Sequence, residues 1–263
     1  MNHKVQIDAV IRIHEQIRGA YRQMYLEAPS IAQVAEPGQF VHLQLPGLGE
    51  RVLRRPFSIC AADAGRGLLR IVYKVVGVGT EHLQTLQPGQ HLNILGPLGR
   101  GFSPLPRDRR SILVGGGYGC AAMYFVAQRA GVLPLVLLGA RGQEDVILAE
   151  EFQALGCEVR IATDDGTLGQ KGRVTVLLEQ AAQEFPQAWL AACGPLPMLK
   201  ALSQFVAQQH WDGELSLDSA MCCGMGACFA CVIKRKADNE QGWSYARVCH
   251  DGPVFKAGDI YWE

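Results

Sequence analysis

The sequence lacks an excess of charge of either sign and lacks a long hydrophobic run. Its 25 Lys and Arg residues balance 25 Asp and Glu residues, so the formal net charge at pH 7 is zero. Such a balance offers no attraction to nucleic acid or to an anionic membrane, and we expect neither partner. The most apolar stretch is interrupted at Gln128 and Arg129, short of the roughly 18 residues that a membrane-spanning helix needs.

The N-terminus, Met-Asn-His-Lys-Val-Gln-Ile-Asp, also lacks the apolar core of a secretory signal peptide. A disulfide framework is therefore disfavoured for the nine cysteines, because such frameworks belong to short secreted proteins. We expect a reducing, cytoplasmic location. At 263 residues the chain is long enough to bury more than one core.

Four cysteines near the C-terminus have the spacing C-x4-C-x2-C-x17-C, which is typical of a plant-type [2Fe-2S] site. They are Cys223, Cys228, Cys231 and Cys249. Soft thiolate ligands suit iron, and the close spacing lets one loop surround most of the cluster. Gly224 and Gly226 fit such a loop, because glycine permits tight turns and lets amide N–H groups approach the cluster sulfur atoms.

Zinc is the alternative metal for these cysteines. Four thiolates can hold zinc tetrahedrally, but zinc sites favour two C-x2-C pairs and this chain has one. The spacing therefore favours iron and leaves zinc open. Cys222 would give the spacing C-x5-C if it replaced Cys223, and we expect Cys222 not to be a ligand.

The hydrophobic pattern changes once along the chain. Up to residue 101, alternating runs separated by turn residues predict an antiparallel β-barrel. These runs are Val5–Ile13, Tyr21–Leu26, Phe40–Leu45, Phe57–Cys60, Leu68–Tyr73 and His91–Leu95. From Ser111, short apolar runs alternate with helical stretches, which predicts a parallel sheet with helices on both faces. The predicted strands are Ser111–Val114, Pro134–Gly139, Cys157–Thr163, Ala188–Cys193 and Glu214–Leu217, and the predicted helices are Ala121–Ala130, Val146–Leu155, Val174–Ala182 and Leu196–Gln209.

These patterns divide the chain into three predicted units. The barrel occupies residues 1–101, the α/β unit residues 102–213 and a small cysteine-bearing segment residues 214–263. The first boundary is expected in the Pro- and Arg-rich loop 102–110. We expect a polar hairpin near residues 236–243. Because the last segment is too small for a core of its own, we expect a metal cluster to hold it together.

The predicted barrel contains a candidate ligand-binding tetrapeptide, Arg55-Pro56-Phe57-Ser58. The planar fork of Arg55 suits a diphosphate, Phe57 suits contact with a flat ring, and Ser58 suits a hydrogen bond to a ring nitrogen. In isolation, the tetrapeptide fits an ordinary barrel strand with a surface arginine and a core phenylalanine equally well.

A second candidate lies further along the barrel. Thr80 is predicted to be the N-cap of a short helix, so that Gly79 and Thr80 would offer free N–H groups to a phosphate. An ordinary capped helix that closes the barrel is the alternative. With Arg55 in the same barrel, the two signals together indicate one site for a flavin dinucleotide.

Two loops of the α/β unit are candidates for a second nucleotide. In the first, Gly115-Gly116-Gly117-Tyr118-Gly119, the backbone could approach a pyrophosphate at a helix N-terminus. Ala122 breaks the strict G-x-G-x-x-G phase, so a tight turn without a ligand stays open. The second, Cys193-Gly194-Pro195-Leu196-Pro197-Met198, ends a predicted strand at the edge where parallel sheets bind ligands, or else is a simple Gly-Pro helix start.

In their order along the chain and in their residues, these motifs resemble one family. The match includes the motifs above together with Ile71-Val72-Tyr73 and the tail Cys249-His250-Asp251-Gly252-Pro253-Val254-Phe255. The chain resembles the electron-transfer subunits of NAD-linked dihydroorotate dehydrogenases, within the ferredoxin–NADP reductase-like superfamily. It departs from many relatives at Ala121-Ala122, where they have prolines, and at Phe57, where the wider superfamily has tyrosine.

The resemblance implies three cofactors and an assignment of residues to each. FAD would contact Arg55, Pro56, Phe57, Ser58, Ile71, Val72, Tyr73, Gly79 and Thr80. NAD would contact Gly115, Gly116, Gly117, Tyr118, Gly119, Cys193, Gly194, Pro195 and Met198. The [2Fe-2S] cluster would be ligated by Cys223, Cys228, Cys231 and Cys249. The three predicted units would then be an FAD-binding barrel, an NAD-binding domain and a cluster domain.

The resemblance also implies a partner, an FMN-containing catalytic subunit that oxidises dihydroorotate to orotate in pyrimidine biosynthesis, in a heterotetramer with two copies of each subunit. A nicotinamide exchanges two electrons as a hydride and the cluster passes one, so a flavin must join them. Electrons would run from FMN through the cluster and FAD to NAD+, and we expect no acid–base residue for orotate chemistry on this chain. The alternatives are a ferredoxin–NAD(P) reductase-type subunit of another complex and a non-catalytic, zinc-bearing partner module.

Overall fold

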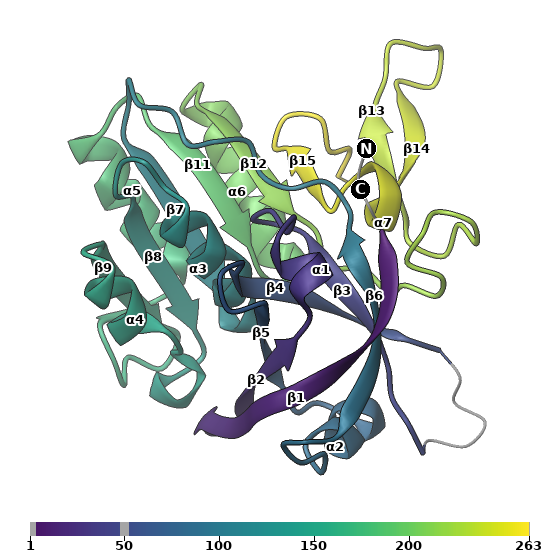
Figure 1. The fold of residues 1–263 in the computed structure, drawn as a ribbon. Coiled ribbons are helices and arrows are strands. Elements are labelled where there is room, and N and C mark those ends of the chain that lie inside the picture. The colour runs from purple at the N-terminus through teal and green to yellow at the C-terminus, as the bar shows by residue number, and fades with distance from the viewer. Residues whose placement is uncertain (1–3, 48–52, 263) are drawn as a thin grey trace.

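The computed structural model describes residues 4–47 and 53–262. The ends of the first and third predicted units, residues 1–3 and 263, lie outside this range. Figure 1 shows a barrel beside a layered sheet, with the C-terminal segment against both. No helix in the described parts of the chain is long and apolar enough to cross a membrane.

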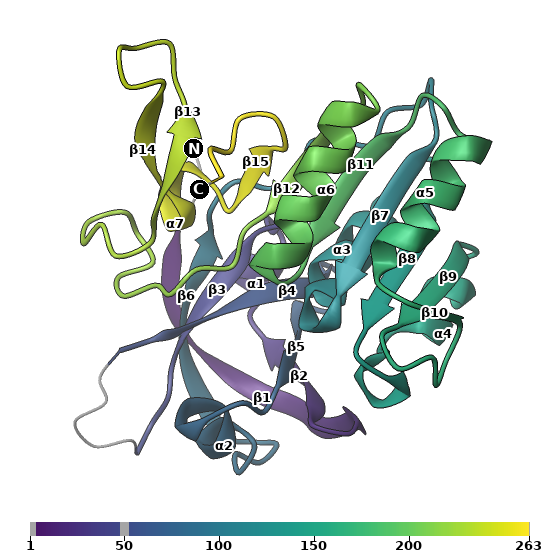
Figure 2. The ribbon, with the colours of Figure 1, turned by 180° about the vertical axis from the view of Figure 1, so that it is seen from behind.

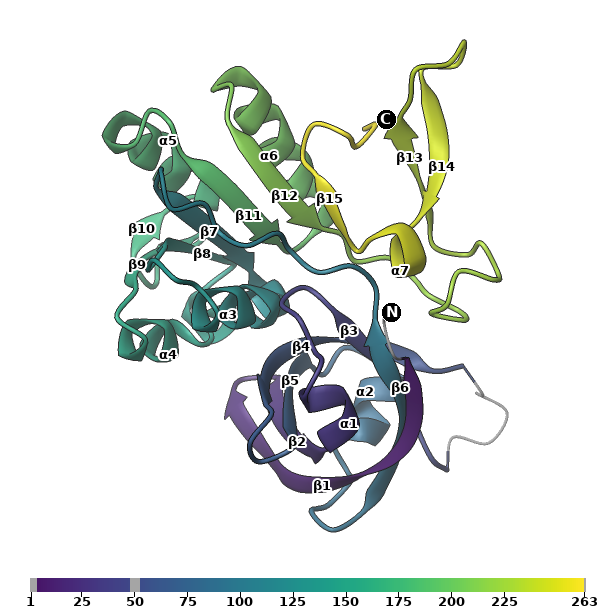
Figure 3. The ribbon, with the colours of Figure 1, turned by 45° about the horizontal axis from the view of Figure 1, so that its top comes forward.

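The N-terminal region is a closed antiparallel barrel with the strand order β1-β2-β5-β4-β3-β6, as predicted. The strands are β1 (Val5–Arg18), β2 (Tyr21–Glu27), β3 (Phe40–Gln44), β4 (Arg55–Asp63), β5 (Leu68–Lys74) and β6 (His91–Leu98). Their inward side chains form one apolar cluster. Two short helices, α1 (Pro29–Ala32) and α2 (Val78–Leu83), lie at opposite ends of the barrel (Figures 1 and 3).

The first strand is longer than its hydrophobic pattern predicts. β1 continues from Ile13 to Arg18 as a mostly exposed arm paired with β2, so backbone pairing and not burial makes this part a strand. Its tip reaches the α/β unit, where Arg18 Nη1 donates to the carbonyl oxygen of Val146 at 3.1 Å.

A seven-stranded sheet follows the barrel, with the order β10-β9-β8-β7-β11-β12-β15. Its strands are β7 (Ser111–Gly116), β8 (Leu135–Ala140), β9 (Glu158–Thr163), β10 (Gln170–Lys171), β11 (Trp189–Cys193), β12 (Asp212–Ser216) and β15 (Val254–Lys256). All neighbours are parallel except β12 and β15. The predicted parallel sheet is therefore confirmed, with an added antiparallel edge strand.

Helices cover both faces of this sheet, as predicted. Helices α3 (Cys120–Gln128) and α4 (Ala149–Ala154) lie on one face, and α5 (Val174–Glu184) and α6 (Leu196–Gln208) lie on the other (Figures 1 and 2). The predicted start of α4 at Val146 is wrong: Leu148 has a left-handed φ of 62°, and residues 146–148 pack into the core as a non-helical segment.

Helix α3 also joins the sheet to the barrel. It is apolar on nearly all sides because it is enclosed: Phe125 belongs to the apolar cluster of the barrel, whereas Met123 and Val126 pack in the cluster beside the sheet. Arg129, just after the helix, donates to the carbonyl oxygen of Ala62 in β4 at 3.3 Å. The barrel and the sheet therefore share buried surface.

The C-terminal segment contains the predicted hairpin, β13 (Val232–Lys236) with β14 (Trp243–Arg247), and a short helix α7 (Val248–Asp251). The expectation that this segment has too little core of its own is met by packing against the sheet, which stabilises the segment in addition to any metal cluster. Val248, Phe255 and Ile260 are buried in the same apolar cluster as the α5–α6 face of the sheet, and β15 pairs with β12. The proposed boundary at residues 213/214 falls inside β12.

Candidate functional site

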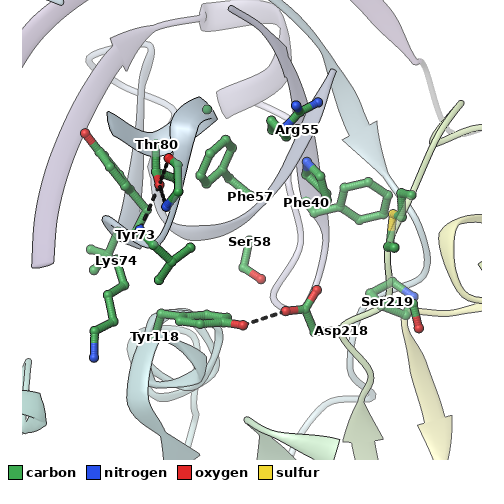
Figure 4. Close-up of a pocket in the computed structure, with 18 of the residues that line it drawn as sticks. Phe40, Arg55, Phe57, Ser58, Tyr73, Lys74, Thr80, Tyr118, Asp218 and Ser219 are labelled. Atoms are coloured by element: carbon green, nitrogen blue, oxygen red, sulfur yellow. Dashed lines mark hydrogen bonds between the residues drawn. The ribbon is translucent and has the colours of Figure 1, made fainter. Parts of the chain in front are cut away.

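A cleft of about 770 Å³ lies where the barrel, the sheet and the C-terminal segment meet (Figure 4). Most of the residues predicted to contact FAD line it: Arg55, Pro56, Phe57, Ser58, Val72, Tyr73, Gly79 and Thr80. Ile71 does not, because its side chain is fully buried in the barrel core. The cleft thus brings together barrel residues from β4, β5 and the start of α2.

One end of the cleft is suited to phosphate. Arg55 lies over Gly79, since a Cβ atom added at Gly79 would lie 3.2 Å from the Nε atom of Arg55. Arg55 Nη1 donates to the carbonyl oxygen of Leu53 at 2.6 Å, which leaves other donors of the guanidinium group for a ligand. A positive side chain beside the first N–H groups of a helix is a favourable setting for an anion.

Thr80 does not have the predicted role of N-cap. Gly77 is the N-cap of α2, and the Thr80 hydroxyl accepts N–H groups from Val76 at 2.9 Å and from Gly77 at 3.2 Å. The reason is that Thr80 stands one turn inside the helix start, where its side chain folds back on the preceding loop. Its hydroxyl fixes this loop, and its backbone borders the cleft.

A neighbouring part of the cleft is aromatic. The rings of Phe57 and Tyr73 pack edge to face with their centroids 5.8 Å apart. The Tyr73 hydroxyl lies 2.8 Å from Nε2 of His14. Burial raises the pKa of Tyr73, so this phenol stays protonated. Ser58 points from β4 toward Tyr118 and Asp218 across the cleft (Figure 4).

Sequence reasoning missed the residues between β12 and the loop that carries Cys223 and Cys228, which we call the cysteine loop. Asp218, Ser219 and Met221 line the cleft, and Tyr118 donates its hydroxyl proton to Asp218 at 2.8 Å (Figure 4). Burial, followed by the nearby Asp218 carboxylate, raises the pKa of Tyr118. The available signal was position, because these residues follow the carboxyl end of a parallel strand, where ligands bind.

The two loops predicted for NAD pack directly against each other. A Cβ atom added at Gly119 would lie 2.3 Å from the carbonyl oxygen of Cys193, and one added at Gly116 would lie 2.7 Å from Sδ of Met198. Real Cβ atoms do not approach so closely, so the contact between the loops by itself requires these glycines. Of the predicted NAD residues, Tyr118 and Cys193 line the cleft; nucleotide contact by the others stays a prediction.

The loop that carries Cys223 and Cys228 wraps its amides around sulfur. The N–H groups of Met225 and Ala227 donate to Sγ of Cys223 at 3.4 and 3.3 Å. Gly224 and Gly226 have left-handed φ values of 69° and 89°, which the tight turn requires. Burial acts to raise the pKa of Cys223, but these amides outweigh it and lower that pKa, which favours the thiolate that binds metal.

The predicted ligands fall into two pairs. Cys223 interacts with Cys228, as Cys222 also does, and Cys249 interacts with Cys231. Burial and the neighbouring Cys231 raise the pKa of Cys249, which favours the protonated thiol. Iron bound at this cysteine would displace the thiol proton. Within residues 4–47 and 53–262, no three His, Cys, Asp or Glu side chains converge as ligands of a single ion. Two pairs of thiolates fit a binuclear cluster, in which each iron takes two cysteines.

His42 is a further residue that the sequence did not single out. It lies on β3, is fully buried, and contacts the cysteine loop at Gly224. Burial, followed by the positive charge of Arg54, lowers the pKa of His42 to about 4, so the imidazole is neutral at physiological pH.

Two family models match the barrel and the C-terminal segment. Residues 8–102 match a family model described as an oxidoreductase FAD-binding domain, and residues 218–261 match the iron–sulfur cluster binding domain of dihydroorotate dehydrogenase B. An electron transfer subunit of dihydroorotate dehydrogenase B (NAD(+)) from Fusobacterium nucleatum is 36% identical, over 96% of this chain and 97% of that protein. The chain belongs to this family.

A second family member, from Geobacillus thermodenitrificans, is 43% identical over 90% of this chain and 91% of that protein. The family predicted from the motifs is therefore confirmed, with its FAD-binding and iron–sulfur-binding regions. Among solved structures, a chain of an NADH-dependent reduced ferredoxin–NADP oxidoreductase, from work on electron bifurcation, is similar. Its TM-score is 0.84, its identity is 29%, and the match covers 90% of that chain. The cytochrome b5 reductase domain of Ulva prolifera nitrate reductase shares the fold, with a TM-score of 0.62 at 18% identity.

Proposed function

We propose that this chain passes electrons from the FMN of a dihydroorotate-oxidising subunit through a [2Fe-2S] cluster and FAD to NAD+. One observation carries the proposal: the segment that leaves β12 first lines the cleft at Asp218 to Met221 and then enters the cysteine loop at Cys223. The flavin cleft and the cysteine loop are therefore adjacent along one short stretch of chain. FAD supplies the step between paired and single electrons.

The chain's own residues bind and orient the cofactors in this proposal. Arg55 and the Gly79–Thr80 backbone hold the diphosphate of FAD, while Phe57, Ser58 and Tyr73 contact the flavin ring. Cys223, Cys228, Cys231 and Cys249 ligate the cluster, and Cys222 does not. The turn Gly115–Gly119 and the loop Cys193–Met198 face the nicotinamide nucleotide, for which Tyr118 and Cys193 border the cleft. No side chain of this chain acts as an acid or base on dihydroorotate.

The catalytic partner docks beside the cysteine loop in this proposal. Large apolar side chains are exposed on the loop and the adjoining hairpin: Met225, Phe229, Val232 and Tyr245. Exposed apolar side chains clustered near a redox site are typical of a surface that another subunit covers. The assembly contains two copies of each subunit and works in the cytoplasm.

The experiment is co-expression with the FMN-containing subunit, followed by purification and assay. The complex should contain FAD, FMN, iron and labile sulfide, and it should reduce NAD+ when dihydroorotate is added. The proposal would be overturned if the complex contained zinc in place of iron, or if the FMN-containing subunit alone reduced NAD+ equally well.

A second candidate function is a reductase that exchanges electrons with ferredoxin in another complex. The similarity to the ferredoxin–NADP oxidoreductase chain, with its TM-score of 0.84, favours this candidate. The same purified protein separates the two: reduced ferredoxin, supplied without any dihydroorotate-oxidising subunit, should support NAD(P)+ reduction only if the second candidate is right.

A further inference from the structure

His42 occupies an unusual position between the flavin cleft and the cysteine loop. On one side its ring packs edge to face with Phe40, with the centroids 6.5 Å apart, and Phe40 lines the cleft. On the other side it lies directly against Gly224, because a Cβ atom added there would be 2.5 Å from Nδ1 of His42. One imidazole therefore touches both regions.

The ring is also a buried polar group without a satisfied hydrogen bond. Neither nitrogen of His42 has a partner among the described residues, although the side chain is fully buried. The carbonyl groups of Cys223 and Arg54 lie near the ring, outside hydrogen-bond geometry. An unsatisfied buried nitrogen costs about 1–3 kcal/mol of folding free energy. A histidine at this position therefore needs a compensating interaction.

The half-buried His14 in the same barrel shows the ordinary arrangement. Its Nδ1 lies 2.8 Å from the carbonyl oxygen of Leu86, and its Nε2 lies 2.8 Å from the Tyr73 hydroxyl. His14 is thus engaged on both sides, whereas His42 has polar capacity left over. That capacity faces the turn between Cys223 and Cys228, which two left-handed glycines hold in shape.

We infer that His42 is a positioning residue for the cluster: its imidazole seats the turn at Gly224 and hydrogen-bonds the Cys223 carbonyl group once the cluster is in place. This inference rests on the proposed function, because it presupposes the [2Fe-2S] cluster. Through this side chain the barrel then helps to fix the cluster loop relative to the flavin cleft. The lack of space between His42 and the turn also explains why residue 224 has no side chain.

Replacement of His42 tests the hydrogen bond. His42→Leu removes both nitrogens but keeps an apolar core side chain, and His42→Asn retains a polar group close to the position of Nδ1. We expect His42→Leu to retain iron and labile sulfide about 5-fold less well than wild type during dialysis, as for the loss of one hydrogen bond. The remaining cluster should show an altered EPR spectrum and midpoint potential, and His42→Asn should lie closer to wild type.

His14→Leu is the matched control in these measurements. It removes another barrel histidine and disturbs Tyr73, so it should affect FAD retention and leave the EPR spectrum of the cluster unchanged. If His42→Leu binds iron as tightly as wild type, with the same spectrum and potential, the inference is overturned. A wild-type protein that holds no iron and sulfide would instead overturn the proposed function.

A second pair of variants tests the contact itself and does not depend on removing His42 alone. Gly224→Ala and Gly242→Ala place a side chain at similar φ values, 69° and 72°, but no atom lies within 4 Å of the added Cβ at Gly242. Gly224→Ala should therefore lose iron while Gly242→Ala retains it. Adding His42→Ala to Gly224→Ala should restore part of the iron content; no recovery would show that His42 does not set the position of the turn.

Discussion

The flavin cleft and the cysteine loop are built in opposite ways. The cleft collects side chains from strands and loops far apart in the chain, such as Arg55, Tyr118 and Asp218, and the paired strands β4 and β5 hold its aromatic part in place. The cysteine loop and the start of α7 carry the four predicted ligands within residues 223–249, and three of the four lie outside regular structure. A site held by strands is present before its ligand binds, whereas a loop site depends on its ligand and its neighbours. Changes in one region should therefore spare the cofactor of the other.

The largest effect that separates the two regions is expected from Cys228→Ser. The exposed Cys228 interacts with Cys223, and a hydroxyl group is a poor ligand for iron compared with a thiolate. The variant should lose nearly all iron and labile sulfide but retain FAD, as measured by metal analysis and flavin absorbance. Cys222→Ser is the control and should keep its iron; unchanged iron in Cys228→Ser would refute the ligand assignment.

The next largest effect concerns the junction of the barrel and the α/β unit. Arg70 in β5 is nearly fully buried and forms a two-point ion pair with Glu151 in α4. Glu151→Ala would leave a buried, unpaired guanidinium group, which costs about 3–5 kcal/mol. Urea denaturation should show this loss. Arg12→Ala, which breaks an exposed pair with Glu27, should change the free energy of unfolding by less than about 1 kcal/mol.

A smaller effect is expected inside the cleft. Arg55→Ala should weaken FAD binding by about 1.5–3 kcal/mol, the range for a hydrogen bond to a charged group. Fluorescence titration of the deflavinated protein with FAD measures this change. Iron content should stay at the wild-type level, because Arg55 does not belong to the cysteine loop. FAD bound as tightly as in wild type would remove Arg55 from the site.

The smallest effect is a pH dependence at the same junction. Burial acts to raise the pKa of Asp145, but Lys74, at 2.5 Å, and Tyr21 outweigh it and hold that pKa below its ordinary 3.8. A depressed pKa in the folded state means that the stabilisation is complete above pH 3.8 and is lost as the pH falls further. Asp145→Asn should therefore be less stable than wild type near neutral pH, with a difference that shrinks below about pH 4. Unfolding curves at several pH values would show whether the difference is instead constant.

Much of the fold was predictable because it depends on local pattern. Alternation distinguishes barrel strands such as His91–Leu98 from the fully buried run Ser111–Gly116, and this difference divides the chain into barrel and sheet. The errors arose where pairing or packing overrides the pattern. The polar arm of β1 is a strand because β2 pairs with it, and β15 joins the sheet although only three residues long.

The sequence by itself determined the spacing of the cysteines, and this spacing favours an iron–sulfur cluster over zinc. It also indicated most of the barrel side of the cleft, since Arg55 to Ser58 on β4 and Gly79 to Thr80 at the start of α2 carry groups suited to a flavin dinucleotide. Only the tertiary structure decided which distant groups meet. His42 reads as an ordinary core position on β3, and nothing near it in the chain indicates Gly224. Their contact arises because the barrel and the C-terminal segment pack together, and such packing between distant segments leaves no local pattern in the sequence.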